Sequence, residues 1–166
     1  MTDTTGENDK SRKGDKSDGK DKSDRSDRSD RNEKVALTPT THTAPPAKFS
    51  HGVRKGNILQ VAGQVGFLPA VEGLPPTPAG PTLREQTLQT LANVRAILEE
   101  GGATWDDVLM IRVYLTDVDH FAEMNALYNE YFDQHLTAVP AARTTVYVGL
   151  PAGLLIEIDA LAVLDD

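Results

Sequence analysis

The chain has 166 residues, a formal net charge of −8 and no cysteine, with 39% hydrophobic and 25% charged side chains. The lack of cysteine excludes disulfides, thiolate metal sites and cysteine nucleophiles. The sequence shows neither an apolar leader nor a run of transmembrane length, and we expect a cytoplasmic protein that does not act at a membrane.

Residues 1–34 differ in composition from the rest of the chain. They contain ten Lys or Arg, ten Asp or Glu, no aromatic residue, and a threefold Ser-Asp-Arg repeat over 23–31. Such a segment buries too little apolar surface to offset the entropy of ordering, so we predict a disordered, charged, low-complexity tail. Its charges cancel (10 − 10), which leaves the −8 on residues 35–166 as 7 basic against 15 acidic side chains. This acidic excess argues against a nucleic-acid partner.

The segment 35–47 is rich in threonine and proline. Proline favours extended backbone, so we predict a linker here and a single domain over 48–166. The domain begins with an apolar, β-branched segment, 57–67, which predicts a strand; Gly63 and Gly66 predict a bend or bulge within it. The Pro- and Gly-rich segment that follows is predicted to be a loop.

A helix is predicted to begin after Thr82, because Thr82 and Glu85 have the spacing of a capping box, and to stop at the glycine pair 101–102. Segment 108–115 has apolar side chains at both odd and even positions, which is typical of a strand buried on both faces. Segment 120–132 repeats large apolar residues at helical spacing and predicts a second helix.

Two further strands are predicted at 143–148 and around Glu157, joined by a turn near Ala152. Together these strands and helices predict an α+β fold with two helices on one face of a mixed sheet. Two helices do not cover all the apolar strand positions, so the uncovered face predicts an oligomer.

Arg143 and Glu157 are single charges within these last, largely apolar strands. In a simple antiparallel hairpin their odd positions would lie on one face, with Arg143 opposite Leu161 and roughly 13 Å from Glu157. This spacing predicts a groove in which the guanidinium binds a carboxylate and the glutamate positions or deprotonates a water. The alternative is that Arg143 pairs with an acid of a neighbouring subunit and Glu157 is an exposed strand residue.

Four stretches of the domain carry a family resemblance. They are AGQVGF (62–67), LANVRAILEEGGA (91–103), VYLTDVDHFAEMNALYNEYF (113–132) and PAARTTVYVGLPAGLLIEIDALAV (140–163). In this order they resemble the reactive-intermediate deaminase family, also called Rid or YjgF. The resemblance covers the domain from residue 48 to 163 and none of the tail.

The resemblance implies a chorismate-mutase-like fold, a homotrimer with clefts between subunits, and hydrolysis of enamines and imines such as 2-aminoacrylate to 2-keto acids and ammonia. It places the carboxylate clamp on Arg143, helped by the backbone amide of Thr145, and the water-positioning group on Glu157. Asn125 stands at a family-like position beside the cleft, with a helix-surface amide as the alternative. No metal and no organic cofactor are implied.

The sequence departs from the family pattern at two accessory positions. Phe49 stands where deaminating members carry a tyrosine, and Ala62 where they often carry a serine, so both lack a hydroxyl that would contact substrate. Thr145 replaces a frequent cysteine, which leaves the backbone amide. The missing hydroxyls keep open a second hypothesis, a trimeric module that binds a small carboxylate metabolite without turnover. A third, the RNA cleavage attributed to some relatives, is disfavoured by the acidic charge.

Overall fold

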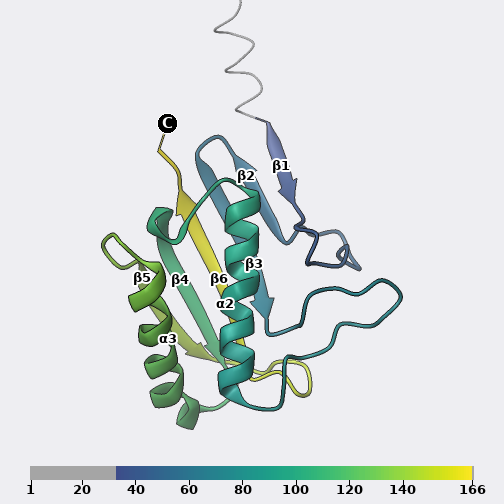
Figure 1. Ribbon diagram of the computed structural model, residues 1–166, viewed down its shortest axis with the longest axis vertical. Coiled ribbons are helices and arrows are strands. Elements are labelled where there is room, and N and C mark those ends of the chain that lie inside the picture. Colours follow the sequence, from purple (N-terminus) through teal and green to yellow (C-terminus); the bar gives the residue numbers. More distant parts are fainter. Residues whose placement is uncertain (1–32, 166) are drawn as a thin grey trace, which may run out of the picture. The chain divides into compact units, whose positions relative to one another are not determined.

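The computed structural model describes residues 33–165, so all but the last two residues of the predicted charged tail lie outside the described residues. The described chain forms six strands and two long helices (Figure 1). In order these are β1 (Lys34–Leu37), β2 (Gly52–Lys55), β3 (Ile58–Val65), α2 (Leu83–Glu100), β4 (Val108–Leu115), α3 (Phe121–His135), β5 (Ala142–Tyr147) and β6 (Ile156–Val163).

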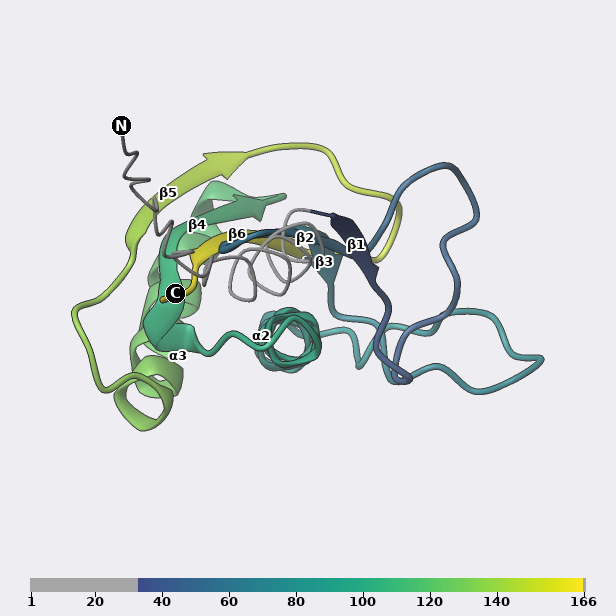
Figure 2. The same cartoon turned by 90° about the horizontal axis from the view of Figure 1, so that it is seen from above.

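The strands form one mixed sheet in the order β1-β2-β3-β6-β4-β5. Only β4 and β5 run parallel, and every other neighbouring pair is antiparallel. Both long helices pack on one face of the sheet, as Figure 2 shows when the molecule is seen from above. The predicted α+β class and the two helices on one face of a mixed sheet are therefore confirmed.

The predicted hairpin between the last two strands is wrong. β4 lies between them: it pairs in parallel with β5, Ile111 opposite Arg143, and antiparallel with β6, Tyr114 opposite Glu157. The turn after β5 therefore crosses over β4, and β6 becomes a central strand between β3 and β4.

Part of the predicted linker is a strand of the sheet. β1 pairs with β2, and Leu37 at its end is 5% exposed and packs into the hydrophobic core. The Pro- and Thr-rich composition hid this short strand, since only one of its four side chains is buried. The folded unit therefore begins earlier than the predicted boundary at residue 48.

The local signals in the sequence otherwise correspond to the observed elements. Thr82 caps α2 in a capping box with Glu85, and the chain leaves the helix at Gly101. The strand over 58–65 carries a β-bulge between Val61 and Gln64, around Gly63. Among the described residues, no helix is both long and apolar enough to cross a membrane.

Gln86 connects α2 to two loops below the sheet. Its side chain is fully buried; the amide nitrogen donates to the carbonyls of Gly80 (3.0 Å) and Gly153 (2.7 Å), and the amide oxygen accepts from the backbone N–H of Leu155 (2.9 Å). These three bonds hold the loop before α2 and the crossover before β6 against the same helix. They position the start of β6, and with it Glu157.

We expect Gln86→Leu to destabilise the fold by roughly 2–4 kcal/mol, because three backbone groups lose the hydrogen bonds that they make to a fully buried side chain. Chemical denaturation measures this difference. Gln134→Leu on the exposed surface of α3 is the matched control and should change the unfolding free energy by no more than about 0.5 kcal/mol. Equal stability of Gln86→Leu and the wild type would show that these bonds do not hold the two loops.

Candidate functional site

Arg143 lies on the helix-covered side of the sheet edge, against α3. Its Nη2 donates to Oδ1 of Asn125 at 2.7 Å, and its Cζ lies 4.5 Å from the centroid of the Tyr128 ring. Within residues 33–165, no carboxylate lies at ion-pair distance from this guanidinium. An amide and an aromatic face orient the charge without neutralising it, so the arginine keeps its capacity to bind an anion.

Glu157 points to the opposite, helix-free face. Its neighbours across the strands are Val65 of β3 and Tyr114 of β4. The carboxylate packs directly over the Cα of Gly63, so closely that a Cβ at that position would overlap its Oε1. Burial, and secondarily the charge of Asp159, raise the pKa of Glu157.

Asp159 is fixed next to Glu157 on this helix-free face. It is 7% exposed, accepts from Nε of Arg112 and from the hydroxyl of Tyr114, both at 2.8 Å, and so has a firmly held carboxylate. The Arg112 side chain of the Arg112–Asp159 ion pair is half exposed. The ion pair therefore orients the Asp159 carboxylate more than it stabilises the fold. A fixed negative charge near Glu157 favours the protonated form of Glu157.

The expectation that Arg143 and Glu157 share a face is wrong for a single chain. Arg143 lies opposite Ile111, whose side chain is in the core, whereas Glu157 lies opposite Tyr114 on the helix-free face. Because β4 intervenes and neighbouring side chains on it alternate between faces, the two charges lie on opposite sides of the sheet. No groove between them exists within one subunit.

The other predicted site residues fall into two groups. Asn125 contacts Arg143 directly, and Thr145 follows it on the same face of β5, opposite Val113. Phe49 is 51% exposed and lines a cavity at the other end of the sheet, and Ala62 lies in the β3 bulge, its N–H bonded to the carbonyl of His51. The predicted site residues therefore lie in two separate places, Asn125 and Thr145 with Arg143, and Phe49 and Ala62 near the β3 bulge against which Glu157 packs.

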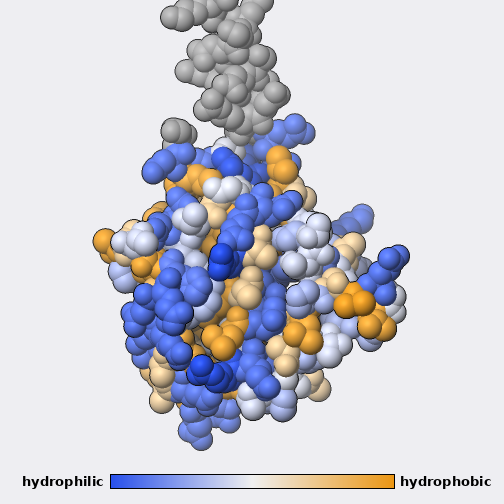
Figure 3. Space-filling view, in the orientation of Figure 1, coloured by the Kyte–Doolittle hydropathy of each residue, from blue (hydrophilic) through white to orange (hydrophobic). Residues whose placement is uncertain are grey.

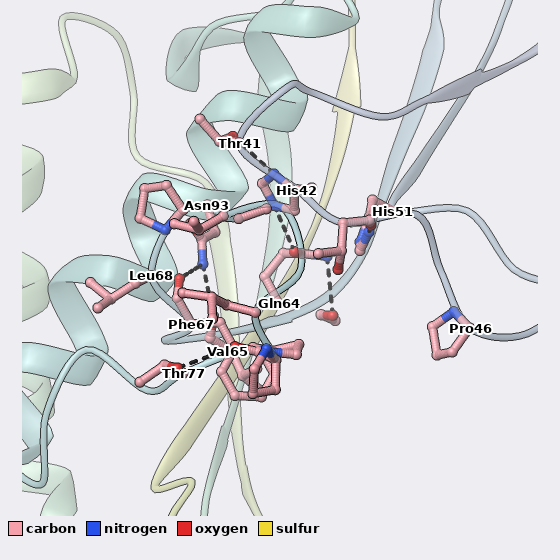
Figure 4. A pocket seen from close by; sticks show the side chains of 18 of the residues that line it. Thr41, His42, Pro46, His51, Gln64, Val65, Phe67, Leu68, Thr77 and Asn93 are labelled. Carbon is pink, nitrogen blue, oxygen red and sulfur yellow. Dashed lines mark hydrogen bonds between the residues drawn. The ribbon is translucent and has the colours of Figure 1, made fainter.

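The cavity next to Phe49 has a volume of about 490 Å³ and opens between the loop 41–51 and the segment 63–77 (Figure 4). Sequence reasoning missed it because its walls come from the segment interpreted as a linker and from a Pro-rich loop. His42 and His51 stand on its wall with ring centroids 4.8 Å apart. Within residues 33–165, no three potential metal-ligand side chains gather into a cluster.

A family model described as Endoribonuclease L-PSP matches residues 40–164. The chain belongs to the Rid/YjgF family. A RutC family protein of Saccharolobus solfataricus is 39% identical over 119 residues, covering 71% of this chain and 88% of the relative. The protein of Escherichia coli K12 named 2-iminobutanoate/2-iminopropanoate deaminase is 34% identical over 128 residues, covering 76% and 96%.

Solved structures of Rid/YjgF proteins share the fold. The E. coli protein TdcF with bound serine superposes with a TM-score of 0.68 at 27% identity, covering 79% of this chain and 99% of that one. The YjgF gene product from E. coli gives a TM-score of 0.68 at 32% identity, with coverage of 78% and 98%. The similarity confirms the family and fold that the four sequence motifs indicated.

The raised pKa of Glu157 predicts a pH-dependent stability cost. Its folded pKa lies above the ordinary 4.5, so its stabilising contribution is present at lower pH and is lost as pH rises through the folded pKa. We therefore expect Glu157→Gln to gain thermal stability relative to the wild type at pH 7 but not at pH 4. Melting curves at both pH values measure this.

Glu72→Gln is the control, because Glu72 is an exposed loop residue, and its melting temperature should follow that of the wild type at both pH values. A Glu157→Gln protein less stable than the wild type at pH 7, with no change at pH 4, would contradict the inferred cost.

Proposed function

We propose that this Rid/YjgF protein hydrolyses reactive imines and enamines of amino acids to 2-keto acids and ammonia, with Arg143 binding the substrate carboxylate and Glu157 activating water. The observation that carries the proposal is the guanidinium of Arg143, oriented by Asn125 and Tyr128 but paired with no carboxylate of residues 33–165. The named deaminase relative and the serine bound to TdcF support a small amino-acid-like ligand.

The opposite faces of Arg143 and Glu157 support a site built from two copies of the chain. β5 is an edge strand, with Val146 37% exposed and Tyr147 48% exposed. Within residues 33–165, no helix covers the face of the sheet opposite α2 and α3 (Figure 2). A homotrimer that buries this face can bring Arg143 of one copy towards Glu157 of the next, which gives each cleft one complete set of groups.

In the reaction, water adds to C2 of the imine and forms a tetrahedral carbinolamine. Glu157 accepts a proton of the attacking water and returns it to the nitrogen, which gives the neutral carbinolamine. As the C–N bond breaks, the same carboxylate takes the proton of the C2 hydroxyl and passes a proton to the amine, so that ammonia leaves and C2 becomes the ketone. An enamine first takes a proton at C3 and loses one from nitrogen to become the imine. Burial raises the pKa of the Glu157 carboxyl group, which makes it a better proton acceptor than an exposed glutamate, and Arg143 holds the substrate carboxylate throughout.

The missing hydroxyls at Phe49 and Ala62 favour one second candidate, a trimer that binds a 2-keto acid in the same clefts without turnover. Ligand-dependent thermal stabilisation in a protein that releases no ammonia would identify it. The family description names an endoribonuclease, but the charge of −8 on residues 35–166 opposes RNA binding.

We expect Arg143→Ala to slow hydrolysis of 2-aminoacrylate by roughly a hundredfold or more, because the carboxylate loses its clamp. Arg143→Lys should recover only part of the rate, since an ammonium is not a planar fork. The substrate is generated enzymatically from serine, and its decay is followed with a carbonyl-trapping reagent. Arg95→Ala on the exposed surface of α2, where Arg95 pairs with Glu99, is the control; a fully active Arg143→Ala would end the proposal.

Glu157→Gln should abolish turnover while leaving binding of pyruvate intact, because the carboxylate clamp lies elsewhere. Pyruvate binding is measured by thermal shift or calorimetry on the same preparation. A variant that still releases ammonia at the wild-type rate would remove Glu157 from the mechanism and leave the carboxylate-binding role of Arg143 standing.

A further inference from the structure

The cavity beside Phe49 is larger than a three-carbon substrate requires. Its volume of about 490 Å³ falls within the roughly 300–1,000 Å³ typical of sites for drug-sized ligands. An imine derived from serine has no side chain beyond one carbon and would leave most of this space to water. The cavity therefore has room for a substantial apolar group.

Gly63 connects the cavity to the proposed reacting centre. It forms part of the cavity wall, and the carboxylate of Glu157 rests against its Cα. A substrate with its C2 atom beside Glu157 would have this cavity as its neighbour on the other side of Gly63. Because residue 63 has no side chain, the carboxylate of Glu157 can rest against the backbone that forms this part of the cavity wall.

The cavity wall is mainly apolar. Phe49, Phe67 and Leu68 contribute to it, with a run of proline, alanine and valine side chains. Asn93 also reaches the wall, but its amide nitrogen is bound to the carbonyls of Val65 (2.9 Å) and Phe67 (2.8 Å). Its donors are therefore used to hold the wall, as Figure 4 shows.

The two histidines on the cavity wall, His42 and His51, also form hydrogen bonds within the protein. Nε2 of His42 donates to Oε1 of Gln64 at 3.1 Å. The Gln64 amide has this orientation because its Nε2 donates to the backbone carbonyls of Ala62 and Gly63. Nε2 of His51 donates to the carbonyl of Thr43 at 2.8 Å. Burial, and secondarily the proximity of His51, lower the pKa of His42, so its ring is neutral at pH 7 and is compatible with an apolar ligand.

The rim of the cavity exposes large apolar side chains. Leu68, Val71 and Leu74 are 46%, 59% and 62% exposed. In Figure 3 hydrophobic surface gathers on this loop, at the right of the view. A ligand group entering the cavity would remove part of this surface from water, which favours apolar ligands over polar ones.

We propose that the cavity binds the substrate side chain, and that the preferred substrates are 2-imino acids with bulky apolar side chains, aromatic ones foremost. This inference rests on the proposed function, since it places the reacting carbon beside Glu157. The ring faces of Phe49 and Phe67 suit a benzyl or indolyl group, and the cavity accepts such a group without a charged partner.

The first test compares two imines with the wild-type protein. L-Amino-acid oxidase with catalase generates them from L-phenylalanine and from L-alanine, and their decay is followed by trapping with semicarbazide. We expect kcat/KM for the phenylalanine-derived imine to be roughly tenfold or more above that for the alanine-derived imine. Equal values, or a preference for the small imine, would overturn the inference while leaving the proposed deaminase activity in place.

The second test fills the cavity. Ala70 is half-buried on its wall, and its only described hydrogen bond is through the backbone, to the carbonyl of Thr41. We expect Ala70→Trp to lower kcat/KM for the phenylalanine-derived imine by roughly tenfold or more and to change that for the alanine-derived imine less than twofold. Ala92→Trp on the exposed surface of α2 is the matched control and should change neither value. Equal loss on both imines in a folded Ala70→Trp protein would count against the cavity as the side-chain site.

A binding measurement separates the two proposals. If the wild type hydrolyses no imine, the proposed function fails, and thermal shifts with phenylpyruvate and pyruvate then decide the inference on their own. A stronger shift with phenylpyruvate that is lost in Ala70→Trp would support the cavity as a side-chain site of a binding module. No difference between the two keto acids would overturn it.

Discussion

The pairing of β6 along both of its edges is the constraint on which the rest of the site depends. β3 and β4 hold this strand on either side, so its register fixes which residues face the core and which face away. Ile156 and Ile158 are fully buried on the helix-covered side of the sheet. Glu157, which lies between them in the strand, must therefore point to the helix-free face. Glu157 is therefore placed by the hydrophobic core as much as by any polar contact of its own.

The same register separates the two charged groups of the proposed reaction. Inserting β4 between β5 and β6 puts Arg143 against α3 and Glu157 on the other side of the sheet. A single subunit thus has an anion-binding group without a nearby proton acceptor, and a proton acceptor without a nearby anion-binding group. Assembly of subunits would then be a condition of the proposed chemistry, which fits a sheet whose face with Glu157 is covered by neither α2 nor α3.

The environment of Glu157 is unfavourable for an ionised carboxylate. The chain buries it over Gly63 and keeps Asp159 nearby, while Arg112 and Tyr114 both bind Asp159 and leave Glu157 uncompensated. Such an arrangement costs stability at neutral pH and is typical of functional groups whose protonation has been adjusted to a reaction. Phe49 and Ala62, which lack the hydroxyls expected from the family resemblance, leave this carboxylate unchanged.

The sequence by itself determined the local elements and the family. The capping box at Thr82, the stop at Gly101 and the bulge around Gly63 depend on nearby residues, so they could be identified from the sequence alone. The sequence singled out Asn125 by its family-like position, but its hydrogen bond to Arg143 is known only from the structure. Only the tertiary structure decided that β1 belongs to the sheet, that β4 separates the last two strands, and that residues 41–51 enclose a cavity with a distant loop. Strand order and cavity walls arise from long-range pairing and packing, and neighbouring residues in the sequence do not specify which distant strand will pair with them.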